Sequence, residues 1–398
     1  RFRKMISVEV ALQVWAEDNQ TTRSWAHIHC LLEQMPDSVA RKLDRSICWW
    51  LRAVAKTAQP EKEVFFRLCK RFLSLPRDSE MREDILGWAI NHPIGLLTEA
   101  LLDWWYKQSP KPGAGLPEIL APIFTKLCNP ANINYRAGRV VLAARTISFF
   151  RVDEPWARQN LIPLFDWGRS TEEARIMWHG FMWAGQLYRP FLEAVKQSFL
   201  DAANYYGDLR DAGPRYAEFL ALAAVDRGDT FTVEEMRRAT SRLPLAGLVS
   251  SLHVLARSAE GAGQRQMEYW KNRIRPYLHD IWPKSRRFLT EEIKRAMAEL
   301  CVAAGEAFPA AYYDLKDWLY PVQYPELMLH RVKAQKIIEK FPEEALDFMD
   351  KLFADDPDYH GSSLKECLDA VVKRMPGLAN DGRHERLTLL LRKRGWLE

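Results

Sequence analysis

The sequence predicts an all-α protein, built as a HEAT-like solenoid of helical repeats, with a compact multi-helix bundle as the alternative. Three observations support this. Apolar residues recur at steps of three and four, short turn segments separate these stretches, and no run alternates between apolar and polar residues for the length of a strand. A βαβ fold, and with it a dinucleotide-binding fold, is therefore not expected.

The helical period is clearest in four segments. They carry Val140, Ala144, Ile147 and Phe150; Leu192, Val195, Phe199, Ala202 and Tyr206; Leu248, Leu252, Leu255 and Ala259; and Ile293, Met297, Leu300, Ala304 and Phe308. Each set lines one face of an amphipathic helix. Extended along the chain, the pattern predicts roughly fifteen helices of ordinary length.

Helix starts are marked by hydroxyl residues followed three positions later by glutamate. The pairs are Ser170 with Glu173, Thr232 with Glu235, and Ser363 with Glu366. In such a capping box the hydroxyl accepts a bond from a free backbone N–H, and the glutamate bonds back to the cap residue. The three pairs therefore predict three helix N-termini.

Aromatic residues are abundant, with 15 Trp in the chain, and many of them are adjacent. The pairs are Trp49–Trp50, Trp104–Trp105, Phe149–Phe150, Tyr205–Tyr206 and Tyr312–Tyr313. Neighbouring helix residues point about 100° apart, so such a pair widens the apolar stripe, as a helix with two packed neighbours requires. Met177, Trp178, Phe181, Met182 and Trp183 are likewise interpreted as a core stripe and not as a cofactor site.

Pro- and Gly-rich breaks divide the chain into three predicted parts. These are an N-terminal helical subdomain over residues 1–108, HEAT-like repeats over 116–319, and a C-terminal helical subdomain over 326–398. Within the middle part a helix, a short turn and a second helix recur at a spacing of roughly 35–45 residues, the scale of two-helix repeats.

The sequence has neither a membrane-spanning segment nor closely spaced cysteines. No apolar run approaches the roughly 18–20 residues that cross a bilayer, and no secretory leader precedes the first helix, so a cytoplasmic protein without a membrane partner is expected. The chain starts at Arg1 and not at Met, which suggests a piece of a larger protein. Its six cysteines lie far apart and are expected to be scattered, buried thiols and not a disulfide or zinc framework.

Motifs for catalysis, metal or cofactor binding are absent: the sequence has no Cys-x-x-Cys, His-Glu-x-x-His, Gly-x-Ser-x-Gly or phosphate-binding glycine loop. We therefore expect no catalytic residue, no metal and no cofactor in this region. The Asn91-His92-Pro93 segment is interpreted as a turn before an apolar helix and not as an acid–base site. A site assembled from distant residues would include side chains such as Glu99, Asp103, Asp166 and His179, without a spacing argument.

Basic residues form three clusters in a chain of net charge +5. The candidate contacts to nucleic acid or to an acidic partner are Lys284, Arg286 and Arg287; Arg237 and Arg238; and Arg392, Lys393 and Arg394. Nucleic-acid binding would require these clusters on one face, with aromatic residues between them. Solvated helix faces and helix C-terminal charges are the alternative.

Four stretches carry a resemblance to a known class of proteins. They are Leu86–Trp105, Asp153–Trp167, Glu299–Leu319 and Lys340–Phe353. Together they resemble the long C-terminal helical region of bacterial anti-phage defence proteins, which follows an N-terminal effector that is often a sirtuin-like, NAD-degrading domain. The resemblance implies a sensor or scaffold that recognises a phage component and controls the effector. It brings no catalytic motif into this chain.

The sequence thus favours a non-catalytic interaction or sensor scaffold in a larger anti-phage defence protein, because helix spacing and aromatic content suit partner binding. A protein partner, either a phage component or the effector domain, is expected, and the scaffold is free to form oligomers. The alternative is a helical-repeat protein that binds nucleic acid.

Overall fold

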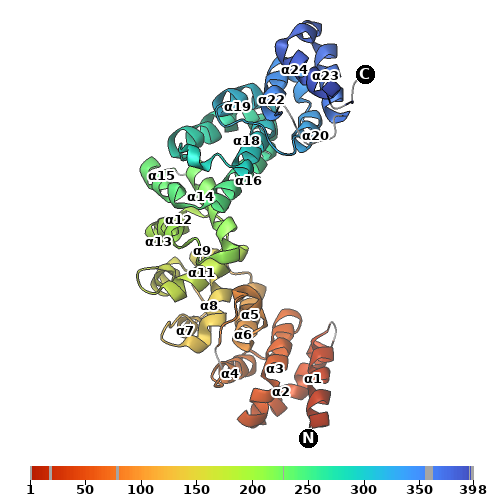
Figure 1. Ribbon diagram of the computed structural model, residues 1–398. Helices are drawn as coiled ribbons and strands as arrows, with labels where there is room; N and C mark the ends of the chain where they lie inside the picture. Colours follow the sequence, from red (N-terminus) through yellow and green to blue (C-terminus); the bar gives the residue numbers. More distant parts are fainter. Residues whose placement is uncertain are drawn as a thin grey trace. The chain divides into compact units, whose positions relative to one another are not determined.

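The computed structural model describes residues 2–17, 20–77, 80–226, 228–354, 362–393 and 395, with residues 2–7 and 362 described by their backbone only (Figure 1). Throughout these ranges the backbone forms helices joined by turns, and no strand is present. The predicted all-α class is therefore confirmed.

Two compact units make up the fold. Unit 1 contains residues 1–202 and 208–212, and unit 2 contains residues 203–207 and 213–398. The boundary lies within the predicted middle part, whereas the predicted three-part division stays a prediction.

Helices of unit 1 are α1 (Phe2–Ala16), α2 (Thr21–Gln34), α3 (Asp37–Thr57), α4 (Lys62–Leu73), α5 (Ile85–Asn91), α6 (Pro93–Lys107), α7 (Ala121–Leu127), α8 (Arg136–Ala143), α9 (Thr146–Val152), α10 (Glu154–Asn160), α11 (Thr171–Ala184), α12 (Arg189–Ala194) and α13 (Lys196–Asp201). Helices of unit 2 are α14 (Gly213–Val225), α15 (Val233–Arg242), α16 (Leu245–Gly261), α17 (Gln266–Tyr269), α18 (Glu291–Ala303), α19 (Phe308–Leu315), α20 (Glu326–Ala334), α21 (Ile337–Lys340), α22 (Pro342–Leu352), α23 (Ser362–Arg374) and α24 (Gly382–Lys393). The short 3₁₀ turns are η1 (Ile133–Tyr135), η2 (Ile162–Phe165), η3 (Ala202–Tyr205), η4 (Arg210–Ala212), η5 (Gly263–Arg265), η8 (Arg286–Phe288), η9 (Gly305–Ala307) and η10 (Pro376–Asn380), and the π-helical turns are η6 (Trp270–Ile274) and η7 (Tyr277–Ile281).

Each unit is organised around a row of helices in which every member packs against the next. In unit 1 the row is α1, α3, α6, α8 and α11. In unit 2 it is α14, α16, α18, α20 and α23. The other helices flank these rows: α2 and α4, for example, pack on each other and on α3.

Arginine side chains hold neighbouring helices together at their C-terminal ends. Arg71 donates to the carbonyl oxygens of Leu32, Glu33 and Met35, at the end of α2. In unit 2, Arg386 donates in the same manner to the carbonyls of Asp350 and Phe353. The last carbonyls of a helix have no partner within it and carry partial negative charge, so a guanidinium satisfies both needs.

Helices are more numerous and shorter than predicted: the described residues form twenty-four α-helices instead of roughly fifteen. Three of the four apolar stripes cross a break between helices. The stripe from Ile293 to Phe308, for example, spans α18 and α19, because Gly305 between them takes a left-handed backbone (φ 53°). Its apolar residues stay buried on both sides of the break.

Of the three predicted capping boxes, one is complete. Thr232 caps α15 and Glu235 bonds back to its backbone N–H. Ser170 caps α11, but the Glu173 carboxylate turns to Arg139 instead. Glu366 is bound by Lys333, and Ser363 lies inside α23, so the third box is wrong.

Adjacent aromatic residues do not all widen a buried stripe, as the sequence predicted. Phe149 and Phe150 are both buried, but Trp50 is fully buried while 46% of Trp49 is exposed. Trp183, which the sequence assigned to a core stripe, is also 46% exposed, whereas Trp178, five residues earlier on the same helix, is buried. Two large aromatic surfaces of unit 1 therefore face solvent.

Two further expectations concern membranes and thiols. In the described part of the chain no single helix is both long and apolar enough to cross a membrane, and α5 with α6 meets the criteria only as a pair bent by 70°. All six cysteines are free thiols. Five are buried, as expected, and Cys30 is exposed.

Candidate functional site

Helix α3 of unit 1 presents a mixed basic and aromatic face. Arg45, Trp49, Arg52 and Lys56 follow one another at steps of four, three and four, which places them on one side of the helix. The neighbouring side, about 100° around the helix, carries fully buried residues such as Trp50. The Trp50 side chain therefore enters the core, and the Trp49 side chain stays partly exposed.

The facing side of α6 carries two carboxylates and a phenol, Glu99, Asp103 and Tyr106. Arg52 Nη1 lies 2.5 Å from Glu99 Oε2, and Arg52 Nε lies 3.6 Å from Asp103 Oδ2. One guanidinium thus serves two carboxylates. These groups line an open pocket of about 320 Å³ with Leu102, Arg145 and Ser148, which we call the Glu99 pocket.

Burial is the main influence on both carboxylates of this pocket. It raises the pKa of Glu99 above its ordinary value, while the Arg52 charge acts in the opposite direction. Burial raises the pKa of Asp103 as well, again opposed by Arg52. The single guanidinium does not compensate the loss of water around two acids.

Arg145 closes the pocket from the turn before α9. Its guanidinium carbon lies 6.0 Å from the ring centroid of Trp183 on α11. Within the described residues this guanidinium makes no hydrogen bond and no ion pair. Arg145 therefore connects the α6 side of the pocket to the exposed Trp183.

On α11, His179 lies one turn before Trp183 and is 4% exposed. Its Nδ1 lies 3.6 Å from Asp211 Oδ1 on η4. Burial lowers the pKa of His179, and the Asp211 charge acts against this. A neutral imidazole is therefore favoured near neutral pH.

Helices α6 and α11 carry buried polar atoms that have no partner in hydrogen-bond geometry. In the part of unit 1 that the structure describes they are Glu99 Oε2, Asp103 Oδ2, Tyr106 Oη, Arg175 Nε and His179 Nε2. Buried groups of this kind cost free energy in an isolated protein. We call this set, with Trp49, Arg52, Arg145 and Trp183, the polar face of unit 1.

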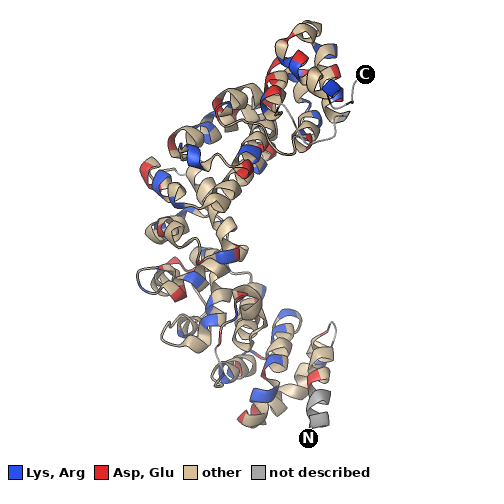
Figure 2. Ribbon diagram, in the orientation of Figure 1, with Lys and Arg blue, Asp and Glu red and all other residues tan. Residues whose placement is uncertain are grey.

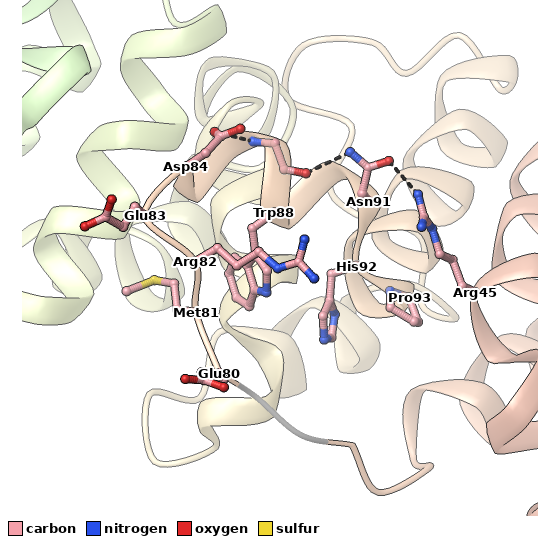
Figure 3. A pocket seen from close by; sticks show the side chains of 11 residues that line it. Arg45, Glu80, Met81, Arg82, Glu83, Asp84, Trp88, Asn91, His92 and Pro93 are labelled. Carbon is pink, nitrogen blue, oxygen red and sulfur yellow. Dashed lines mark hydrogen bonds between the residues drawn. The ribbon is translucent and has the colours of Figure 1, made fainter.

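A larger pocket of about 1030 Å³ lies where α3, the residues before α5 and the start of α6 meet (Figure 3). We call it the Trp88 pocket. The Trp88 and His92 rings lie side by side, with centroids 5.3 Å apart, and in the view of Figure 3 Arg82 and Arg45 flank them. Three acidic residues at positions 80, 83 and 84 complete the lining.

Hydrogen bonds fix one wall of the Trp88 pocket. Arg45 Nη2 donates to Asn91 Oδ1 (3.1 Å), and Asn91 Nδ2 donates to the carbonyl of Gly87 (2.8 Å). His92 is the N-cap of α6, and its Nδ1 accepts from Ile94 N–H at 3.2 Å, as the interpretation of a Pro-marked turn requires. The pocket offers an aromatic wall with charges of both signs, which suits a peptide better than a simple ion.

Two neighbouring residues of η4 contact the Trp88 pocket and the polar face, one each. Glu83, on the rim of the pocket, lies 3.5 Å from Arg210. The next residue, Asp211, is the partner of His179. Arg210 has a left-handed backbone (φ 45°), which is uncommon for a residue with a side chain.

Asp166, the fourth residue considered for a distant-residue site, lies elsewhere. It lines a third pocket, of about 530 Å³, with Arg136 and Glu173. Behind that pocket, Arg139 is fully buried and donates to both oxygens of Glu173 (2.7 and 3.1 Å) and to three carbonyls of residues 127–132. This network joins α8 to α11 and holds the fold together.

Two of the three predicted basic clusters meet in unit 2. Arg237 Nε on α15 donates to the carbonyl of Asp280 at 2.7 Å, which places α15 against η7. Lys284 follows η7 and donates to the carbonyl of Leu278. Arg237 and Arg238 both contact Glu234, so their charges are partly compensated.

Arg286 and Arg287 are exposed on η8, and the Arg287 guanidinium lies over the Phe288 ring at 4.6 Å. Arg392 and Lys393 are exposed at the end of α24, which packs on α22, α23 and η10 and not on α15. Arg394 lies outside the described residues. Figure 2 shows acidic and basic residues interspersed along the helices of both units.

Sequence reasoning named Glu99, Asp103 and His179 without a reason to join them, and it missed Arg52, Arg145 and the two exposed Trp. One available signal was the spacing of Arg45, Trp49, Arg52 and Lys56, which puts a Trp on a charged helix face. The role of Arg145 needs contacts between helices that are distant in sequence. Within the described residues no group of three or more His, Cys, Asp and Glu side chains is placed to hold a metal ion.

Comparison with known proteins gives one similarity. A stretch of 123 residues, 30% of the chain, is 29% identical to the uncharacterized protein y4cA of Sinorhizobium fredii. The aligned part is 10% of that protein, so the chain spans only a small share of its relative's length. No protein-family model and no solved structure matches the chain.

Proposed function

We propose that this chain is a non-catalytic recognition scaffold that binds a protein partner on the polar face of unit 1. One observation carries the proposal: two half-exposed Trp side chains, Trp49 on α3 and Trp183 on α11, belong to helices that Arg52 and Arg145 connect to the Glu99 pocket on α6. Partly buried aromatic and arginine side chains are the residues that contribute most to protein–protein binding. A partner that covers this face would bury the exposed parts of the two Trp side chains and could bond to the Arg145 guanidinium.

The resemblance to anti-phage defence proteins suggests the biological role of this scaffold. We propose that the chain is the recognition or regulatory region of a larger, cytoplasmic anti-phage defence protein. The similarity to a small part of a much longer bacterial protein is compatible with a region of that kind. The partner is then either a phage component or an effector domain.

Site-specific crosslinking tests the location of the partner. A photo-crosslinking amino acid replaces Trp183 in the natural protein, and a matched one replaces Tyr313, which is also an exposed aromatic residue but lies in unit 2. We expect a discrete protein adduct from position 183 and not from position 313. Equal adducts from both positions, or none from 183, would contradict the proposal.

The timing of the adduct separates the two kinds of partner. A phage component gives the adduct at position 183 only in infected cells, whereas an effector domain gives it in uninfected cells too. A plaque assay adds the biological outcome: Trp49→Ala with Trp183→Ala should lower protection, and Tyr313→Ala should not. Unchanged protection in the double variant would separate the face from any role in defence.

Nucleic-acid binding is a second candidate, and one contact favours it. The bond from Arg237 to the Asp280 carbonyl brings two basic clusters together in unit 2. If they bind phosphates, affinity for a single-stranded oligonucleotide should fall steeply with salt, and Arg286→Gln with Arg287→Gln should reduce the slope by about 2. Arg392→Gln with Lys393→Gln is the matched control, since those residues lie on another helix. Weak binding without salt dependence would remove this candidate.

A further inference from the structure

The Glu99 pocket presents charges of both signs, but they differ in access. Arg52 is about one third exposed (35%), whereas the side chain of Glu99 is 9% exposed. One oxygen of each carboxylate, Glu99 Oε2 and Asp103 Oδ2, is buried, although the Asp103 side chain as a whole is 29% exposed. A ligand in the pocket therefore meets Arg52, Arg145 and part of Asp103, while Glu99 is largely covered.

Among these groups, the Arg145 guanidinium has N–H donors that are not engaged in a hydrogen bond. Arg52 already serves Glu99 and Asp103, but the Arg145 guanidinium makes no hydrogen bond or ion pair within the described residues. Its contact is with the face of the Trp183 ring, which leaves the N–H groups at its edge available. The hydroxyl of Ser148 lines the same pocket.

We propose that the Glu99 pocket binds a carboxylate side chain from an acidic segment of the protein partner. Arg145 donates to that carboxylate in a two-bond, charge-assisted contact, and Arg52 adds positive charge. Trp183, and Trp49 one turn from Arg52, receive the apolar side chains next to it. This rests on the proposed function, since it names the chemistry of the partner at the same face.

Charge complementarity favours an acidic ligand over a basic one. The pocket and its rim hold Arg52, Arg145 and Lys56 against Glu99 and Asp103, and Lys56 is exposed. The two carboxylates are already engaged by Arg52, whereas the Arg145 guanidinium has no ion pair within the described residues. A basic side chain would meet the guanidinium groups of Arg52 and Arg145 in the pocket, where like charges repel.

Selection from a random-peptide library on the intact chain tests the chemistry. We expect enrichment of peptides that carry Asp or Glu beside an aromatic or aliphatic residue. Enrichment of basic or uncharged peptides, or of none, would overturn the proposal. An oligonucleotide that binds in an Arg145-dependent manner, with no acidic peptide enriched, would also overturn it in favour of phosphate.

Variants then assign the binding to the pocket. For an enriched acidic peptide, Arg145→Gln should raise Kd about tenfold or more, and Arg145→Lys should raise it less. Arg151→Gln is the matched control and should leave Kd unchanged, because Arg151 also lies over an aromatic ring, Tyr188, but outside the pocket. An equal loss in Arg151→Gln would contradict the assignment.

One variant should bind more tightly, which loss of folding cannot imitate. Asp103→Asn removes a negative charge from the pocket and keeps the shape of the side chain, so acidic peptides should gain affinity by several-fold. Unchanged or weaker binding would overturn the proposal. If the natural partner still crosslinks at position 183 in Arg145→Gln, the proposed function stands and this inference alone fails.

Discussion

The rows of helices in the two units carry ion pairs between successive members, but in different environments. In unit 2, Arg257 on α16 pairs with Glu218 on α14 (2.5 Å), and Lys333 on α20 pairs with Glu366 on α23 (2.7 Å); the Arg257 and Glu366 side chains are well exposed. In unit 1, one guanidinium serves two largely buried carboxylates of α6, with unsatisfied polar atoms around them. Exposed pairs of the first kind contribute little to stability or binding. Removal of one member of a largely buried group costs more, because it leaves the remaining charge without compensation.

Removal of the most buried charge should have the largest effect. Arg139→Ala leaves the buried Glu173 with Arg136 as its remaining guanidinium partner and removes the bonds to three carbonyls, so it should lower the free energy of unfolding by about 3 kcal/mol. Urea unfolding followed by tryptophan fluorescence measures this. Arg139→Met with Glu173→Met removes both charges and should cost less than the single variant. A single variant within about 1 kcal/mol of the parent would show that the α8–α11 network is not what stabilises unit 1.

The Trp49–Trp50 pair allows a comparison within one helix turn. Trp50→Ala should cost about 3–5 kcal/mol, since it opens a cavity in the core. Trp49→Ala should change stability by about 0.5 kcal/mol or less, as substitutions on a surface do. Thermal and urea unfolding of the two variants should therefore separate clearly. Similar losses in both would mean that Trp49 belongs to the core after all.

The pH dependence of stability should differ between the parent and a neutralised pocket. The folded state raises the pKa of Glu99 and of Asp103, so between the ordinary carboxyl pKa and the raised one the folded state binds more protons than the unfolded state. Stability from this source is present at lower pH and is lost as pH rises through that window. Glu99→Gln with Asp103→Asn should flatten this fall in a series of urea titrations. A fall of the same size in the double variant would place its origin elsewhere.

The exposed pairs of unit 2 should give the smallest effect. Arg257→Ala should lower the free energy of unfolding by less than about 1 kcal/mol, and salt should shrink the difference further. Unfolding at low and at high ionic strength measures both. A large, salt-independent loss would remove the contrast between the two units.

The fold class was predictable because helices leave a local trace in the sequence. Steps of three and four, such as those from Leu248 to Ala259 in α16, depend only on which side of a helix is buried. The number of helices was not predictable in the same way. Short breaks, such as that at Gly305, leave the apolar residues in register with their neighbours, so two helices look like one.

The candidate site was only partly predictable. Glu99 and Asp103 are one turn apart on a helix, so their proximity can be derived from the sequence. Their dependence on Arg52, and the approach of Arg145 to Trp183, come from helices in contact across 38 to 51 residues of chain, which no local pattern reports. The difference in exposure between Trp49 and Trp50 likewise depends on which neighbour each ring meets.

The arginine side chains that cap helix C-termini have a consequence for how damage spreads. Arg71 reaches residues 36 to 39 positions earlier in the chain, and Arg386 reaches residues 33 to 36 positions earlier. Each such bond therefore joins a helix pair to the one before it and to no other. In a structure linked only to nearest neighbours, cooperativity decays along the chain. Amide hydrogen exchange after Arg71→Ala should accelerate in α2, α3 and α4 and return to the parent rate within the next helices of the row.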